Sequence, residues 1–331
     1  MVDLNKKNIL ITGGAGFIGS NLAIEIQSKF PKSNITIFDC FRNEKTFSNG
    51  NLMSLGHFEN LSNFNGEIIC GNINSEDDIS ILKKYKFDYI FHQAAISDTR
   101  VTDQEAIFKT NINSFYHILD MVKSMNSILV YASSAATYGN SISPQKIGSE
   151  SPNNPYGFSK NIMDKIAMKF IKNNPDKTII GLRYFNVYGP GEFYKNTTAS
   201  TVLQFALQIL SNHPPKLFKA SDKIFRDFVY IKDVIMANLL ACSSKKSGIY
   251  NVGTGIPRSF QDIADILLKE LNSSFKCKYI PNPYKNNYQF HTQADLSIIK
   301  KNLNYTPQWS LEDGIKDYIP EIIKIDNKFN T

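Results

Sequence analysis

The sequence predicts an α/β protein built on a doubly wound parallel sheet, with a second, smaller α/β substrate-binding domain. Short runs of β-branched and apolar residues alternate with longer amphipathic segments through the first half of the chain. Parallel strands need a connecting helix at each crossover, and they are covered on both faces, so their sequences are apolar throughout. A glycine-rich turn follows the first apolar run directly, which is typical of doubly wound sheets that bind a dinucleotide.

Six apolar runs are expected to be strands of this sheet: residues 8–12, 35–38, 67–70, 89–92, 128–132 and 178–182. Beyond residue 183 the alternation becomes irregular. We expect a loop at 188–198, a helix at 200–210 and a strand at 216–218, followed by regular structure again at 228–240 and 250–253. The sequence therefore predicts a dinucleotide-binding domain over residues 1–182, with later returns near 228–255, and a mainly substrate-binding domain over 183–331.

Composition narrows the class of protein. The chain has 331 residues, enough for a sizeable core, and its first apolar run is too short for a signal peptide or a spanning helix, so we expect a cytoplasmic protein without membrane association. Its four cysteines and five histidines lack metal-ligand spacing, so no metal is expected. The net charge of +7 comes from dispersed lysines, which argues against nucleic acid as a partner and suits a phosphorylated small molecule.

Residues 12–19 (TGGAGFIG) lead from the first strand into a helix that we expect to begin around Ser20. Gly13, Gly16 and Gly19 permit a tight turn and a close approach to a pyrophosphate, which the amides of a helix N-terminus would bind. Asp39 follows Gly19 by twenty residues, at the end of the second strand, where a carboxylate binds the adenosine ribose. The turn therefore predicts a dinucleotide site.

The choice between NAD and NADP stays open on these residues. Asp39 favours NAD, because its carboxylate repels the additional phosphate of NADP, whereas Arg42 could offset that charge or be a solvated loop residue. After the fourth strand, Gln93, Ala94 and Ala95 offer small side chains where the cofactor could pass closely, or where a helix could pack on the sheet.

A catalytic pair is predicted at Tyr156 and Lys160, which lie four residues apart and therefore one above the other on a helix face. Tyrosine titrates near pH ~10 in water, so it is a poor base at neutral pH. An adjacent ammonium and a positively charged nicotinamide would favour the phenolate. Ser134, after the fifth strand, could donate a hydrogen bond to the same substrate oxygen.

The motifs together resemble the extended short-chain dehydrogenase/reductases. Narrower stretches resemble one group of that family, the ADP-glyceromanno-heptose 6-epimerases: residues 131–139 (YASSAATYG), 182–190 (LRYFNVYGP), 215–218 (PKLF), 226–234 (RDFVYIKDV) and 291–296 (HTQADL). The resemblance implies tightly held NADP, with NAD as the alternative, and a homo-oligomer, often a pentamer. It also implies inversion of carbon 6 of ADP-D-glycero-D-manno-heptose through a transient ketone, for heptose incorporation into lipopolysaccharide core.

By resemblance, Tyr156 is one base and Lys195, within residues 189–195 (GPGEFYK), is the second. Two fixed bases let the ketone present either face to the hydride. The resemblance places cofactor contacts at Phe17, Ile18, Asp39, Cys40, Gln93, Ala94, Ala95, Ile96, Ser97, Asn111, Lys160 and Val187. It places substrate contacts at Asn186, Thr197, Gln204, Phe218, Lys219, Ala220, Ser221, Arg226 and Tyr288.

Several alternatives remain at this point. Arg226 suits a diphosphate because a guanidinium binds it through paired, charge-assisted hydrogen bonds, but it could instead form an ion pair with Asp227 or another carboxylate. Tyr288 could belong to the core. The activity could be that of another sugar-nucleotide epimerase or reductase of the same family. A nicotinamide-binding sensor or scaffold would be expected to lack the catalytic tyrosine or lysine, and both are present.

Overall fold

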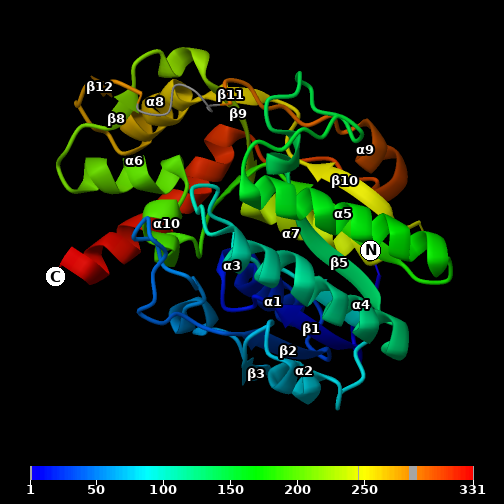
Figure 1. Ribbon diagram of the computed structural model, residues 1–331. Helices are drawn as coiled ribbons and strands as arrows, with labels where there is room; N and C mark the ends of the chain where they lie inside the picture. The colour runs from blue at the N-terminus through cyan, green and yellow to red at the C-terminus, as the bar shows by residue number, and fades with distance from the viewer. Residues whose placement is uncertain (1, 245, 283–288, 331) are drawn as a thin grey trace.

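Seven parallel strands form the central sheet of the computed structural model, which describes residues 2–244, 246–282 and 289–330 (Figure 1). In spatial order the strands are β10 (Gly248–Val252), β6 (Ile179–Tyr184), β5 (Ile128–Ser134), β4 (Tyr89–His92), β1 (Asn8–Thr12), β2 (Asn34–Asp39) and β3 (Glu67–Cys70). The predicted α/β fold with a doubly wound parallel sheet is confirmed, and all six predicted strands belong to the sheet. The seventh, β10, shows that the chain returns to the sheet near residue 250.

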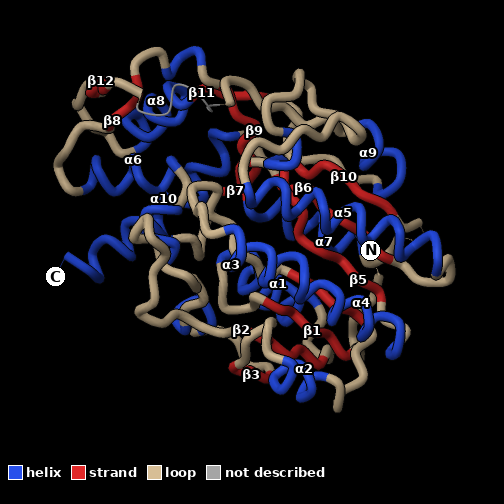
Figure 2. The backbone as a smooth tube through the Cα atoms, viewed as in Figure 1, coloured by secondary structure: helices blue, strands red, loops and turns tan. Residues whose placement is uncertain are grey.

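Helices cover both faces of the sheet (Figure 2). Neighbouring residues of each strand point to opposite faces, and apolar residues of β1 are buried on both. Ile9 and Ile11 of β1 pack in one hydrophobic cluster with α1 (Phe17–Lys29) and α7 (Ile231–Ala241). Leu10 packs in a second cluster with α2 (Glu76–Leu82), α4 (Ser114–Met125) and α5 (Pro155–Asn173). The strands are therefore buried on both sides, which is why they are recognisable in the sequence as short apolar runs.

Helix α1 begins at Phe17, so the predicted start near Ser20 is wrong by three residues. Serine is a favourable residue just before a helix, but here it lies inside the first turn. Its side chain is buried and its Oγ donates to the carbonyl of Phe17 at 3.2 Å. Gly16 takes the position before the helix instead, and no side chain caps the first amides.

Two small sheets lie beside the central one, in the part of the chain drawn green to red in Figure 1. The first has the order β11 (Pro257–Ser259), β9 (Phe225–Tyr230) and β7 (Asn186–Tyr188), and the second pairs β12 (Lys278–Ile280) with β8 (Lys216–Phe218). The helices in this part of the chain, besides α7, are α6 (Thr201–Leu210), α8 (Phe260–Glu270), α9 (Ser297–Leu303), which packs on β10, and α10 (Leu311–Asn330). The predicted helix at 200–210 and strand at 216–218 are confirmed, and the predicted loop at 188–198 contains a 3₁₀ helix, Phe193–Thr198.

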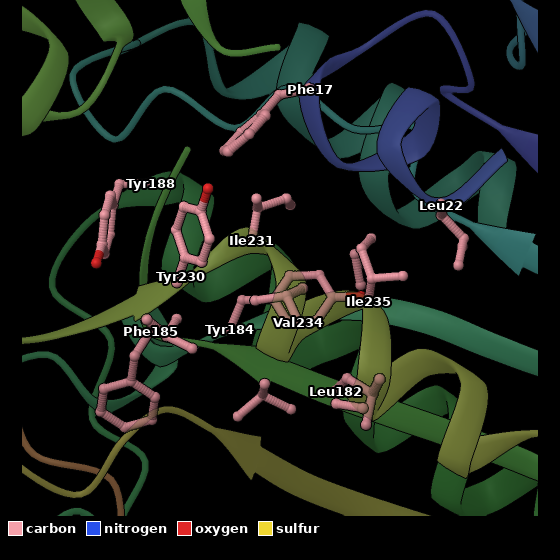
Figure 3. Packing of buried hydrophobic residues seen from close by; sticks show 14 of the residues in the cluster. Phe17, Leu22, Leu182, Tyr184, Phe185, Tyr188, Tyr230, Ile231, Val234 and Ile235 are labelled. Carbon is pink, nitrogen blue, oxygen red and sulfur yellow. The ribbon is translucent and has the colours of Figure 1, made fainter. Parts of the chain in front are cut away.

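One hydrophobic cluster runs from the central sheet into the smaller sheets without interruption. Figure 3 shows Leu22 of α1, Val234 of α7, and Tyr188 and Tyr230 of the three-stranded sheet within this cluster. The division into a cofactor domain and a substrate domain at residue 182 therefore stays a prediction. Among the described residues, none of the helices combines the length and apolar character needed to cross a membrane.

Candidate active site

The glycine-rich turn lies where the strand order reverses, between the carboxyl ends of β1 and β4. Ligands of doubly wound sheets bind at this crevice. Gly13 has a φ of +69°, and a Cβ there would lie 2.6 Å from the amide nitrogen of Ala94 in the loop after β4. Because α1 has no side-chain cap, its first amides are available to an anion. The turn therefore fits the pyrophosphate of a dinucleotide, and only glycine fits at residue 13.

Asp39 shapes this turn from the end of β2. Its side chain is buried, Oδ2 accepts a hydrogen bond from the amide of Ala15 at 3.0 Å, and Oδ1 accepts one from the amide of Phe41 at 2.8 Å. Burial raises the pKa of Asp39, while these backbone bonds oppose the shift. Cys40 is exposed, with Sγ 3.2 Å from the hydroxyl of Ser54.

Arg42 contacts the loop that carries Lys195, and its predicted contact with the cofactor stays a prediction. Its guanidinium donates to the backbone carbonyl of Tyr194 and lies 5.8 Å from the centre of that ring. The ring of Tyr194 also stacks on His57, with 3.6 Å between ring centres. Arg42 therefore connects the loop after β2 to the loop that carries Lys195, which is a role the sequence did not suggest.

The loop after β4 is held by polar side chains of several elements. Gln93 accepts a hydrogen bond from the hydroxyl of Tyr184 at 3.2 Å. Asn111 is fully buried in a short π-helical turn, Lys109–Asn113, of the type that often marks functional sites. Its side chain makes two 2.9 Å hydrogen bonds to the backbone of Ile96 and donates a third, also of 2.9 Å, to the hydroxyl of Ser159 on α5. The loop is thereby tied to the helix that carries Tyr156 and Lys160.

Tyr156 meets Ser134 because α5 packs its backbone directly on the 3₁₀ turn after β5. A Cβ at Gly157 would lie only 2.3 Å from the carbonyl oxygen of Ala136. This close approach lets the side chains of Tyr156 and Ser134 form a hydrogen bond. Burial raises the pKa of Tyr156, and the bond to Ser134 opposes that shift. The phenol therefore needs further positive charge nearby to act as a base.

Lys160 lies one helical turn beyond Tyr156 on α5. Its side chain is 1% exposed, and Nζ donates to the carbonyl of Ala132 on β5 at 2.7 Å. Burial lowers its pKa to about 8, while the carboxylate of Asp164 opposes the shift. Lys160 is therefore mostly cationic at neutral pH, and its ammonium is fixed between α5 and β5. Ser134, Tyr156 and Lys160 form the first group of predicted site residues that the fold brings together.

Lys195 belongs to a second group. Its Nζ lies 5.3 Å from the centre of the Phe17 ring, at the start of α1, and burial lowers its pKa against the attraction of Glu192 and Asp98. A pocket of about 210 Å³ lies beside it, lined by Ser97, Asp98, Thr99, Arg100, Lys195, Thr197, Thr198 and Ala199. Three predicted site residues, one each from the cofactor, catalytic and substrate sets, therefore share one cavity.

The other predicted substrate residues are more widely spread. Thr197 donates to Asn51 at 2.7 Å, Gln204 on α6 donates to the carbonyl of Ala199 at 2.7 Å, and Asn186 is exposed on β7. Ile18 and Val187, which were predicted as cofactor contacts, are partly buried against the main core. These positions border the Lys195 loop or the strand that precedes it.

Arg226 lies on β9, nearly buried, with its guanidinium donating to the carbonyl of Phe225 and lying 5.7 Å from the ring of Phe260. Asp227 follows it directly, so its side chain points to the other face of the strand. The carboxylate of Asp227 accepts hydrogen bonds from Thr254, Gly255 and Ala294. The ion pair between Arg226 and Asp227 is thus not favoured by their places on the strand.

Residues 218–221 form the turn between β8 and a 3₁₀ helix, Ser221–Lys223. Lys219 donates its amide to the carbonyl of Ile280 at 2.8 Å, and Ala220 has a φ of +63°. The hydroxyl of Ser221 is buried without a hydrogen-bond partner among the described residues. A buried polar group without a partner in the protein is consistent with a hydrogen bond to a bound ligand. The predicted contact Tyr288 lies outside the described residues.

Two buried acids were missed in the sequence. Asp164 lies one turn beyond Lys160 on α5, a spacing that could have indicated it. Glu192 is fully buried three residues before Lys195, and nothing in the spacing indicated its burial. Both influence the charge state of a predicted catalytic lysine.

Comparisons with known proteins agree with this geometry. Residues 9–253 match the model of a family described as the NAD dependent epimerase/dehydratase family. The chain is 35% identical over 316 residues to an ADP-L-glycero-D-manno-heptose-6-epimerase of Brachyspira hyodysenteriae, covering 94% of this chain and 96% of that protein. The crystal structure of the Helicobacter pylori ADP-L-glycero-D-manno-heptose-6-epimerase matches with a TM-score of 0.88 and 48% identity over 97% of both chains.

A third similar structure contains a cofactor. The Bacillus cereus UDP-glucuronic acid 4-epimerase, in complex with UDP-glucuronic acid and NAD, matches with a TM-score of 0.82 and 26% identity, over 96% of this chain and 99% of that one. The resemblance inferred from the motifs is confirmed by these matches.

Proposed function

Because the chain belongs to the NAD dependent epimerase/dehydratase family, we propose that it converts ADP-D-glycero-D-manno-heptose to ADP-L-glycero-D-manno-heptose by inverting carbon 6. The observation that carries this proposal is the similarity over nearly the whole chain to two proteins named for that activity, at 48% and 35% identity. The pocket beside Lys195 supports it, since a second base is what an inversion at one carbon requires.

A nicotinamide is the cofactor of the family, and the glycine-rich turn fits one. When bound, it would supply the hydride acceptor and donor for the oxidation and the reduction at carbon 6. Gly13, Phe17 and Ile18 would hold the pyrophosphate, and Asp39 the adenosine ribose. We propose NADP, with NAD as the alternative. Mass spectrometry of the nucleotide released on denaturation would distinguish the two.

Tyr156 and Lys195 are the two proposed bases. Tyr156 takes or returns the hydroxyl proton on one face of the sugar, with Ser134 donating a hydrogen bond to the same oxygen. Lys160 favours the phenolate through its charge. Lys195 does the same work on the other face, and its depressed pKa makes it a better base at neutral pH than an exposed lysine.

Arg226 and the turn at 218–221 are the proposed contacts for the nucleotide end of the substrate, together with Thr197, Gln204 and Asn186. A nearly buried guanidinium beside an aromatic ring suits a diphosphate. The unpartnered hydroxyl of Ser221 suits a hydrogen bond to the same ligand. We further propose that the enzyme is a cytoplasmic homo-oligomer whose product serves lipopolysaccharide core synthesis.

The test is a substrate panel on the purified protein without added cofactor. ADP-D-glycero-D-manno-heptose should be epimerised, and UDP-glucuronic acid and UDP-glucose should not. Y156F and K195M should each reduce kcat severely while the nicotinamide stays bound. Turnover of a UDP-sugar with no turnover of the ADP-heptose would favour the second candidate, another sugar-nucleotide epimerase, for which the Bacillus cereus structure is the precedent.

A further inference from the structure

A fully buried carboxylate, Glu192, lies in the loop that carries Lys195, and the proposed mechanism does not use it. Its Oε1 accepts hydrogen bonds from the amide of Gly189 at 3.1 Å and from the hydroxyl of Ser200 at 2.7 Å. Its Oε2 accepts one from the amide of Ser200 at 2.6 Å. Gly189 and Ser200 are the two ends of the loop, so a single side chain joins them.

The local backbone couples Glu192 to Lys195 directly. The amide of Lys195 donates to the carbonyl of Glu192 at 3.0 Å, which closes one turn between the two residues. Burial raises the pKa of Glu192, and the nearby Lys195 ammonium and the hydrogen bonds from Ser200 and Gly189 oppose that shift. A carboxylate is costly to bury unless it is hydrogen-bonded, so the loop holds it in one place.

Neighbouring helices fix the first half of the loop. Asn21 of α1 donates to the carbonyl of Pro190 at 2.8 Å, and Glu321 of α10 accepts from the amide of Gly191 at 3.1 Å. Residues 190 and 191 are therefore anchored between the first and the last helix, α1 and α10. Beyond Glu192, Arg42 contacts the carbonyl of Tyr194 and Asn51 accepts from Thr197, while Glu192 joins the two ends of the loop.

We propose that Glu192 is a positioning residue for the second base: its carboxylate closes the ends of the 189–200 loop and thereby holds Nζ of Lys195 beside Phe17, at the edge of the pocket. The inference rests on the proposed function, in which Lys195 is a base. Glu192 itself contacts neither substrate nor cofactor in this account. A purely structural role would change stability without changing which face of the sugar reacts.

The reaction on each face of the sugar can be measured separately. In the proposed mechanism, oxidation of each epimer transfers hydride from carbon 6 to the bound nicotinamide and the hydroxyl proton to one of the two bases. Mixing the enzyme with one epimer at a time, and following the absorbance of the reduced nicotinamide, reports each oxidation. K195M should abolish the oxidation of one epimer, and Y156F that of the other.

E192Q should slow the oxidation of the same epimer as K195M, by roughly 10–100-fold, because a displacement of about 1 Å has effects of this size. The oxidation of the other epimer should be unchanged. S200A, which removes only the hydroxyl bond to Glu192, should give a smaller effect in the same direction and provides a milder variant if E192Q folds poorly. Equal slowing of both epimers by E192Q, or of neither, would overturn the proposal.

D233N is the matched control. Asp233 on α7 is also a buried carboxylate that accepts two backbone amides, those of Gln308 and Trp309 at 2.9 and 3.1 Å, but it lies outside the loop. The D233N substitution should destabilise the protein and should not slow the oxidation of one epimer more than that of the other.

A second measurement does not depend on the substrate. Lys195 should react faster with an amine-labelling reagent in E192Q than in D233N or the wild type, as measured by peptide mass spectrometry. An unchanged labelling rate contradicts the positioning role even if neither ADP-heptose epimer is a substrate. If neither ADP-heptose epimer is oxidised by the wild type while E192Q changes the labelling rate, the proposed function fails and the positioning role stands.

Discussion

Replacing Asp164 by asparagine should lower the free energy of unfolding, because Asp164 is the shared acceptor of a buried hydrogen-bond network next to Lys160. The carboxylate is 2% exposed and accepts hydrogen bonds from Tyr131 at 2.7 Å, Ser133 at 2.9 Å and Arg183 at 2.8 Å. The amide keeps the shape but not the charge, and one of its atoms is a donor that would face other donors. Breaking a buried ion pair by removing one partner costs about 3–5 kcal/mol.

We expect the lower end of that range, because Arg183 retains an ion pair with Glu150 and lies 5.0 Å from the ring of Tyr138. Urea unfolding at pH 7 measures the loss of free energy. D176N is the control, since that carboxylate pairs with Lys177 at an exposed position and its removal should leave the stability essentially unchanged. A loss below about 1 kcal/mol for D164N, the range of exposed pairs, would refute the reasoning.

The same substitution should change the pH profile of activity. Lys160 has a pKa lowered by burial to about 8, and Asp164 opposes that lowering. Without the carboxylate the pKa of Lys160 falls further, so the ammonium that favours the Tyr156 phenolate is lost at lower pH. The alkaline decline of kcat should therefore move to lower pH in D164N and stay in place in D176N. An unmoved alkaline limb would separate Lys160 from the chemistry.

Three further changes follow from single contacts. G157A should lower stability by about 1–3 kcal/mol and reduce kcat, because its Cβ would lie 2.3 Å from the carbonyl of Ala136; wild-type kcat in a folded variant would contradict this. G13A should purify with little bound nucleotide, read from absorbance, because a Cβ there meets the amide of Ala94 at a positive φ; full occupancy would contradict it. His92 is buried with a pKa of about 3, so below pH 6.5 the unfolded state binds a proton that the folded state does not, and stability falls as the pH is lowered. From pH 7 to pH 5, urea unfolding should show wild type losing about 2 kcal/mol more than H92N; equal losses would exclude His92 as the cause.

The sequence predicted those features that depend on local pattern. Strands buried on both faces are continuous apolar runs, and the glycine spacing of residues 12–19 directly after such a run is recognisable in the sequence, although the close contact of Gly13 with Ala94 is not. Tyr156 and Lys160 are close because a helix places residues four apart on one face. Each of these inferences needed no knowledge of how distant segments pack.

The features that the sequence did not predict depend on distant contacts. Arg42 donates to the carbonyl of Tyr194, 152 residues further along the chain. Glu192 is buried because its loop is anchored to Asn21 and Glu321, which lie in the first and last helices. The start of α1 at Phe17, and not near Ser20, is a local difference, because Gly16 takes the position before the helix.

The most direct test of the central claim is the reaction of the purified protein with ADP-D-glycero-D-manno-heptose in deuterated water, followed by NMR of the product. Hydride that leaves carbon 6 for a bound nicotinamide and returns from it does not exchange with solvent. The account predicts formation of the L-glycero epimer without added cofactor and with hydrogen, not deuterium, at carbon 6. Deuterium at that carbon, or no conversion by protein that retains its nicotinamide, would contradict it.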